Sequence, residues 1–284
     1  MSAALPFAQD GSFKVKTLCR RYEGRVVIVT GASRGLGRVI ARRVAEEGAS
    51  VVITDLDGAA ARRTAGLLEK ETGSHFQWAE GDLSEAGVAE QVVAKAAAAF
   101  GRVDTLINNA AALIRMPLVD FTEELMQQAV RGNVWTLLRC CKAVLPQMIA
   151  QKYGRIVNIG GEAWRTGTPH HTLLGGIGKG GMVGLTATLA GETAREGITV
   201  NCVSPAAMAA AGDGDPAATP SVRDPAWNPP AVLAGLAKMA MPATFIGRAA
   251  HLTEVAAAVA FFGSPEASYV TGQHLGVSGG LVMI

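Results

Sequence analysis

The sequence predicts an α/β fold, a doubly wound parallel sheet of seven strands with helices on both faces. Short apolar segments rich in β-branched residues alternate with longer helical segments along the 284 residues. This alternation favours parallel strands joined by right-handed helical crossovers. With 34 glycines and only 5% aromatic residues, the composition also suits close helix-on-sheet packing better than a β-sandwich.

The predicted elements follow from these patterns and from their end signals. The strands are expected at 25–30, 50–54, 75–79, 103–107, 155–159, 198–203 and 273–277. The helices are expected at 36–47, 57–71, 84–100, 122–151, 173–196 and 251–262. Ser84 is the expected cap of the third helix and Pro146 the expected kink of the fourth. The helix at 173 starts among glycines, so we expect a partly unwound first turn or very close packing there.

Residues 1–24 are predicted to form an N-terminal extension, and 25–284 a single domain. An Ala- and Pro-rich insert at about 206–246 is expected to form an apolar lid over a substrate, or else to pack as ordinary helix faces. Its apolar side chains are Met208, Trp227, Leu233, Leu236, Met239 and Met241.

Charge, cysteine content and hydropathy exclude several classes of function. A net charge of +2 argues against nucleic acid or an anionic membrane as the main partner. No apolar run approaches the roughly 20 residues of a membrane span. The four cysteines form no zinc-binding pattern, so no metal is expected, and free thiols favour the reducing cytoplasm.

A glycine-rich loop lies between the first predicted strand and the first predicted helix. It contains Gly31, Ser33, Arg34, Gly35, Leu36 and Gly37. Such glycines let the backbone approach a pyrophosphate, which the helix N-terminus then binds through free N–H groups. Asp55 ends the next strand, where a carboxylate accepts bonds from ribose hydroxyls and repels a 2′-phosphate, so NAD is favoured. Arg34 could instead pair with that phosphate and select NADP, and Asp55 could simply cap the next helix.

These motifs resemble the short-chain dehydrogenase/reductase family from about residue 22 to 281. The loop TGASRGLG matches the family's TGxxxGxG, and the ends of the other strands match in order. The resemblance implies a Rossmann fold, an adenine site at Asp82 and Leu83, and a cofactor wall at Asn109 and Ala110. It further implies a nicotinamide contact at Pro205, a catalytic Asn133, and a Lys179 that holds the nicotinamide ribose. Thr271-Gly272 and Ser278-Gly279-Gly280 match the family's final strand.

Two positions depart from the family's catalytic pattern. The general acid/base Tyr should lie four residues before Lys179, where this chain has Gly175, and the Ser that polarises the substrate oxygen is replaced by Gly161. The interval between them is also one residue longer than usual. Since losing a positioned acid/base typically costs about 10² to 10⁴ in rate, the family's ordinary mechanism cannot operate unchanged.

A substitute acid/base is expected between the fifth strand and the following helix. His171 is the first candidate because a neutral imidazole needs no pKa shift to act near neutral pH. If neither histidine acts, the remaining candidates are Glu162, Lys179 or an ordered water. The alternatives are that His170 and His171 are solvated loop residues, and that Glu162 is a surface charge or an ion-pair partner of Arg165. For Asn133 the alternative is a hydrogen bond at a helix kink.

The sequence therefore predicts an NAD-dependent oxidoreductase for a small, mostly apolar alcohol or ketone, possibly cyclic. A lyase, dehydratase or isomerase on the same scaffold, or an inactive NAD-binding oligomer, is the alternative. The resemblance implies a homo-oligomer, a tetramer or a dimer, with the apolar face at Val134, Leu137, Leu138 and Cys141 as one contact.

Overall fold

The computed structural model describes residues 19–208, 227–228, 230–232, 234–235 and 244–283. Its centre is a seven-stranded sheet with strand order β3-β2-β1-β4-β5-β6-β7, in which every neighbouring pair is parallel. The strands are β1 Val26–Thr30, β2 Ser50–Asp55, β3 Phe76–Glu80, β4 Thr105–Asn108, β5 Gly154–Ile159, β6 Ile198–Pro205 and β7 His274–Val277. The strand order reverses between β1 and β4, so the predicted doubly wound fold is confirmed.

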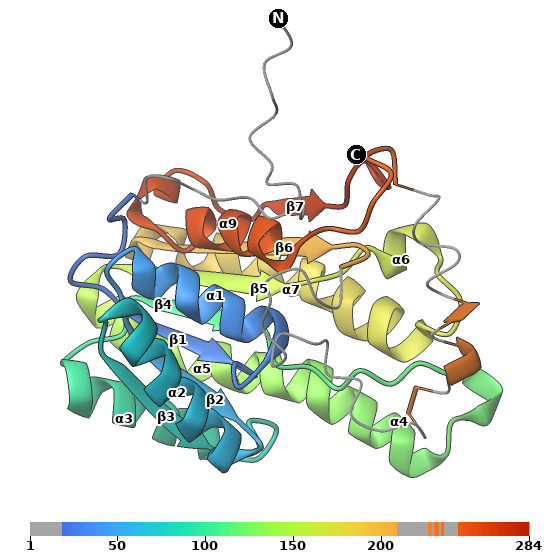
Figure 1. Ribbon diagram of the computed structural model, residues 1–284, viewed down its shortest axis with the longest axis horizontal. Coiled ribbons are helices and arrows are strands. Elements are labelled where there is room, and N and C mark those ends of the chain that lie inside the picture. Colours follow the sequence, from blue (N-terminus) through green and yellow to red (C-terminus); the bar gives the residue numbers. More distant parts are fainter. Residues whose placement is uncertain (1–18, 209–226, 229, 233, 236–243, 284) are drawn as a thin grey trace, which may run out of the picture.

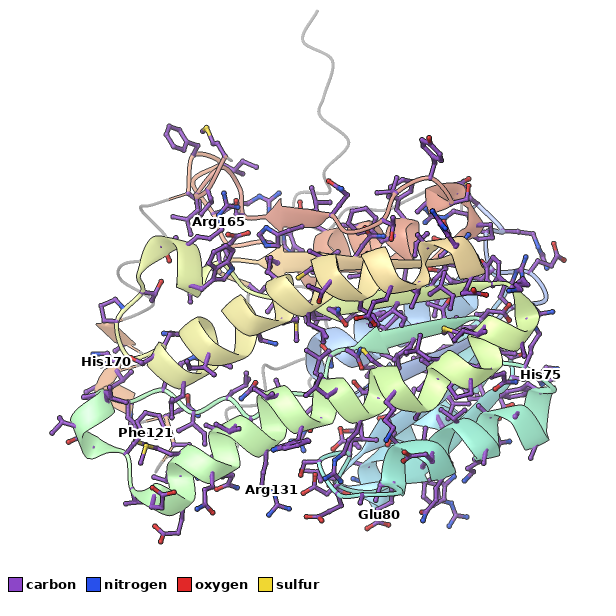
Figure 2. All side chains as sticks on the ribbon, turned by 180° about the vertical axis from the view of Figure 1, so that it is seen from behind. His75, Glu80, Phe121, Arg131, Arg165 and His170 are labelled. Carbon is purple, nitrogen blue, oxygen red and sulfur yellow. The ribbon has the colours of Figure 1, made fainter. Side chains whose placement is uncertain are left out.

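Helices cover both faces of this sheet. One face carries α1 Gly35–Glu46, α2 Gly58–Thr72 and α9 Leu252–Phe262, which lie in front in Figure 1. The other carries α3 Val88–Phe100, α5 Thr136–Gln151 and α7 Gly180–Thr193, seen in front in Figure 2. Two separate apolar clusters fill the two layers, because the strands bury β-branched side chains on both sides. Short elements complete the fold: η1 Leu118–Asp120, α4 Glu123–Val130, α6 Ala163–Thr166, η4 Ala194–Glu196 and η6 Pro265–Ala267.

Two helices contain π-helical turns at the end of the sheet where the strands finish. The predicted helix at 122–151 is confirmed as α4, the π-helical η2 Arg131–Trp135, and α5, which includes Pro146. The helix expected at 173–196 begins as the π-helical η3 Thr172–Lys179 and continues as α7 and η4. The close packing expected at its glycines is found: a Cβ on Gly178 would lie 2.9 Å from Cβ of Asn133.

One predicted cap is wrong. Ser84 does not begin α3, which starts four residues later at Val88 after Gly87, whose φ is +85°. Ser84 instead belongs to the turn after β3, where its backbone N–H donates to Oδ1 of Asp82. A left-handed glycine therefore sets the helix start.

One helical stretch, Thr172–Glu196, is long and apolar enough to cross a membrane by length and composition, with a mean hydropathy of 1.2. In the fold this stretch packs along β6, and Met182, Leu189 and Ala190 belong to the core. It is therefore a core helix here.

Two predicted segments fall largely outside the described residues: the extension at 1–24 and the insert at 206–246. The described end of the extension packs into the fold, since Tyr22 is buried and its hydroxyl donates to the carbonyl of Ala260 at 2.7 Å. In the insert, Met208 and Trp227 are described and line the cavity considered next.

Candidate active site

A cavity of about 1330 Å³ opens at the carboxyl ends of the strands. In open α/β sheets, ligands bind at this edge, beside the point where the strand order reverses. α4 and α6 lie at this end of the molecule in Figure 1. The cavity extends from the glycine-rich loop before α1 to the reaction region around Lys179 and Trp227.

The loop end has the geometry of a pyrophosphate site. Gly31 has a φ of +62°, and a Cβ there would lie 2.9 Å from Cα of Ala110, so glycine is required. Asn109 fixes the loop by donating from Nδ2 to the carbonyls of Thr30 and Gly31. No side chain caps the N-terminus of α1, and Nε of Arg34 is buried without a partner among the described residues. Both features fit a bound anion.

Asp55 lies at the end of β2, in the cavity wall beside the glycine-rich loop. Its side chain is only 7% exposed, and its Oδ2 accepts bonds from Oγ and the backbone N–H of Ser33, at 2.5 and 3.3 Å. Asp57, and not Asp55, caps α2 through Ala60. Among the predicted cofactor residues, eleven line the cavity: Gly31, Arg34, Gly35, Leu36, Asp55, Asp82, Leu83, Asn109, Ala110, Lys179 and Pro205. Ser33 and Gly37 lie behind this wall, where Ser33 holds Asp55.

Lys179 is the buried cation of the reaction region. Its side chain is 8% exposed and its Nζ donates to the carbonyl of Ile159 at 2.7 Å. Burial lowers the pKa of Lys179 to about 8; the nearby Cys202 opposes this shift and the charge of Arg115 adds to it. The ammonium is thus close to losing its proton at neutral pH.

Glu162 is a buried carboxyl, so its interpretation as a surface charge is wrong. It is 2% exposed, lines the cavity, and neither of its oxygens has a hydrogen-bond partner among the described residues. Arg165 and His274 lie at 3.7 Å from its two oxygens. Burial raises the pKa of Glu162, an effect that Arg165 partly offsets. Figure 2 labels Arg165 at this end of the molecule.

His274 and Ser204 lie beside Glu162 and were not predicted as site residues. Nε2 of His274 lies 2.7 Å from Oγ of Ser204, which also accepts the backbone N–H of Gly161. Both residues come from strands far along the chain, so no local pattern marks them.

His171 lies in the cavity wall with both ring nitrogens engaged. Nε of Arg115 lies 3.1 Å from its Nε2, and because a guanidinium can only donate, Nε2 must accept. Nδ1 therefore carries the proton and donates to the carbonyl of Pro169 at 2.9 Å. Burial lowers the pKa of His171, so the ring is neutral. Service as a general base requires the bond from Arg115 to open. His170 has a φ of +63° and is not among the residues that line the cavity. Figure 2 labels it near Phe121 at this end of the molecule.

Asn133 lies within the π-helical turn η2 and does not itself line the cavity. Its Nδ2 donates to the carbonyls of Ala112 and Ala129, both at 2.9 Å, which is the bond at a distorted helix that was the alternative for this residue. Its Oδ1 is buried and has no partner among the described residues.

Arg115, the partner of His171, was not predicted as a site residue. It also donates from Nη1 to Oδ1 of Asn228 at 2.9 Å.

Comparisons with known proteins agree with this geometry. A family model described as enoyl-(acyl carrier protein) reductase matches residues 31–282. The chain belongs to the short-chain dehydrogenase/reductase family. It is 36% identical to 2,3-dihydroxy-2,3-dihydro-p-cumate dehydrogenase of Pseudomonas putida over 262 residues, which cover 92% of this chain and 96% of that protein.

Other relatives lie in the same family. Identity is also 36% to 1,6-dihydroxycyclohexa-2,4-diene-1-carboxylate dehydrogenase of Acinetobacter baylyi, over 92% of this chain and 97% of that protein. It is 33% to the 3-oxoacyl-(acyl-carrier-protein) reductase of Escherichia coli, over 93% and 99%. A solved structure from Sinorhizobium meliloti, assigned to the short-chain alcohol dehydrogenases, superposes with a TM-score of 0.81 at 27% identity, covering 92% of this chain and 98% of that chain. The protein is therefore an oxidoreductase, and dehydrogenases of this family generally use NAD or NADP.

The missing Tyr is not supplied from elsewhere in this short-chain dehydrogenase/reductase. All three tyrosines are described, and none lines the cavity: Tyr22 is in the core, Tyr153 precedes β5 at the opposite end of the sheet, and Tyr269 is fully exposed. The π-helical turn also changes which residue lies one helical turn before Lys179, because its hydrogen bonds reach back five residues instead of four. The N–H of Gly180 bonds to the carbonyl of Gly175 five residues back, so Leu174 and Gly175 share that place, and both line the cavity.

Proposed function

We propose that this protein is an NAD-dependent dehydrogenase for a small, mostly apolar cyclic alcohol, in particular a vicinal ring diol, or for the corresponding ketone. The observation that carries the proposal is one continuous cavity. At one end it has the dinucleotide loop with Asp55, and at the other the desolvated Lys179. Two relatives at 36% identity are named as dehydrogenases of ring diols, which supports this substrate class.

The described residues fit a bound dinucleotide. Gly31 and the uncapped start of α1 would hold the pyrophosphate, Asp55 the adenosine ribose, and Asp82 with Leu83 the adenine. Lys179 would hold the nicotinamide ribose. When bound, the nicotinamide accepts or returns the hydride. Asp55 favours NAD because its carboxylate would repel a 2′-phosphate.

Proton transfer is assigned to Glu162 or Lys179. Oxidation of an alcohol to a ketone gives one hydride to the nicotinamide and one proton to a base. Glu162 is buried, has no hydrogen-bond partner among the described residues, and has its pKa raised by burial, while Lys179 has a pKa of about 8. These perturbed groups in the cavity wall are therefore the candidates for the proton transfer. His171 has its lone pair occupied by Arg115, which gives it a positioning role. Asn133 would brace the turn beside Lys179.

A homo-oligomer in the cytoplasm is part of this proposal. The contact face expected on α5 is only partly available, since Leu137 and Cys141 are buried in the core of the described chain. Trp135, Leu138 and Ile149 remain as exposed apolar side chains on the same helical stretch.

The test is a panel of cyclic cis-diols, alcohols and ketones, followed by NADH absorbance at neutral pH. We expect NADH from at least one ring diol, loss of turnover by about 10² or more in Lys179→Met, and unchanged turnover in Lys142→Met, an exposed lysine on α5. NAD binding by calorimetry without any redox turnover across the panel would favour the non-redox alternative, a lyase, dehydratase or isomerase.

A further inference from the structure

Arg115 lies in the cavity wall on the segment between β4 and η1. The residues on either side, Ile114 and Met116, are buried in a small apolar cluster that includes Leu173 and Trp227. The backbone N–H of Arg115 donates to the carbonyl of Trp227 at 2.8 Å. The guanidinium is therefore carried by a segment anchored on both sides.

Two neutral partners orient the guanidinium. Nε donates to Nε2 of His171 and Nη1 donates to Oδ1 of Asn228. Asn228 is itself fixed, because its Nδ2 donates to the carbonyl of Leu113 at 2.6 Å. These bonds use two of the five N–H donors of an arginine, so the plane of the group is set while donors remain for a ligand.

The charge of Arg115 has no acidic partner among the described residues. Four carboxylic residues line the same cavity, Asp55, Asp82, Glu124 and Glu162, and none forms an ion pair with it. Burial, with no opposing carboxylate, lowers the pKa of Arg115. The charge of Arg115 also lowers the pKa of two nearby bases, Lys179 and His171, and neither of them is an acid that could neutralise it. Desolvating a guanidinium without an anion is unfavourable, so this site is built for one.

We infer that Arg115 binds a carboxylate carried by the ring substrate. A guanidinium matches a carboxylate in shape and charge, whereas a hydroxyl or ketone oxygen would leave the partly buried charge uncompensated. Arg115 bonds to His171, which immediately precedes η3, and η3 carries Lys179, so the anion site lies on the Lys179 side of the cavity. The inference rests on the proposed function for the identity of the rest of the substrate, a cyclic diol.

His171 is a positioning residue in this site. Its neutral Nε2 accepts from Nε of Arg115 only while it is unprotonated, and its Nδ1–H is held by Pro169. A protonated imidazole would place a second cation against the guanidinium. The neutral ring is therefore the form that holds the guanidinium in its present orientation.

The experiment uses the full chain saturated with NAD and unreactive probes of matched shape. Calorimetry compares cyclohexanecarboxylate with cyclohexanecarboxamide on wild type, Arg115→Met, Arg115→Lys and the exposed control Arg62→Met. We expect the acid to bind wild type and the control about tenfold or more tightly than the amide. We expect this preference to vanish in Arg115→Met, to be partly kept in Arg115→Lys, and NAD affinity to stay within about threefold in all four proteins.

Equal binding of acid and amide to wild type would overturn the inference without any variant. So would an unchanged acid preference in Arg115→Met. A large loss of NAD affinity in that variant would instead assign the guanidinium to a cofactor phosphate. The two proposals fail separately: acid-selective binding without NADH formation from any ring diol rejects the redox proposal alone. Turnover of neutral diols as efficient as that of diol acids rejects the carboxylate site alone.

Discussion

The space beside Gly161 faces Lys179: a Cβ built at residue 161 would lie 3.8 Å from Cγ of Lys179, an ordinary van der Waals distance. Gly175 differs, because a Cβ there would lie 2.9 Å from Cβ of Ala163 and 3.1 Å from Cβ of His171. The two positions that lack the family's hydroxyls are thus unequal. One can accept a side chain, and the other has been closed by its neighbours.

Gly161→Ser should therefore fold with nearly unchanged stability, whereas Gly175→Tyr should be destabilised by overpacking, by about 1–3 kcal/mol. Differential scanning calorimetry measures both, and Gly175→Tyr combined with Ala163→Gly should recover part of the loss. Equal unfolding temperatures for the two single variants would show that the backbone and side chain at Ala163 move to accommodate the ring.

Introducing a Ser and a Tyr at the family's positions should raise the rate of carbonyl reduction. Because of the π-helical turn, the Tyr can be placed at residue 174 or at residue 175. Gly161→Ser is combined with Gly175→Tyr in one protein and with Leu174→Tyr in another. Because Leu174 lies 13 residues after Gly161, one fewer than Gly175, we expect the second protein to reduce ring ketones faster. Two proteins that bind NADH and reduce no ketone would show that the cavity now serves other chemistry.

Wild type should bind NAD more tightly than NADP, by about tenfold or more, since Asp55 would face the 2′-phosphate. Asp55→Asn keeps the size of the side chain and should narrow the difference, and calorimetry with both dinucleotides measures it. Arg34→Ala is the matching variant, because it removes the side chain that could instead pair with the 2′-phosphate of NADP. Tighter binding of NADP by wild type, lost in Arg34→Ala, would show that the arginine decides.

The buried Lys179 predicts a pH dependence of stability. With a pKa of about 8 in the fold and about 10.4 in the unfolded chain, the unfolded state holds the extra proton between these values. The Lys179 contribution to the free energy of unfolding therefore rises as pH increases through that window. Burial raises the pKa of Cys141 to about 12, which acts in the opposite direction, so the comparison must be with a variant.

The free energy of unfolding of wild type and Lys179→Met is measured with denaturant at pH 7 and pH 10. The value for Lys179→Met minus that for wild type should be about 2 kcal/mol more favourable at pH 7 than at pH 10. The exposed Lys142→Met should track wild type at both values. A constant difference between Lys179→Met and wild type across this range would contradict a depressed pKa at Lys179.

The chain should assemble through the exposed apolar residues of the η2 and α5 stretch. Light scattering at micromolar concentration should give a tetramer or a dimer, and Leu138→Glu should reduce its mass, while Lys70→Glu, at an exposed position on α2 on the other face of the sheet, should not. A monomeric wild type at that concentration would reject this contact and the expected oligomer together.

The fold, and the residues that line the loop end of the cavity, could be predicted because their signals are local. Each strand is a short run such as 26–30, and the glycine loop, Asp55 and Asp82 follow strand ends directly. The reaction region could be predicted only in part. Arg115 meets His171 and Asn228 across separations of 56 and 113 residues, and Glu162 meets His274 from another strand. No pattern within one segment of the sequence predicts contacts between residues so far apart. The π-helical form of the two turns was not predicted. The glycines at 175, 176 and 178 indicated an irregular helix start without its type, and 131–135 carries no comparable signal.

The widened turn of η3 bears on how such a site could arise. A single-codon insertion in an ordinary α-helix rotates every later side chain by about 100°. Where the added residue is taken up as a π-helical bulge, the rotation ends at the bulge, and Lys179 and α7 keep their register. A change of the residues before Lys179 would therefore require no refitting of α7, and deletion of one residue from 172–176 is expected to restore an ordinary α-helical turn.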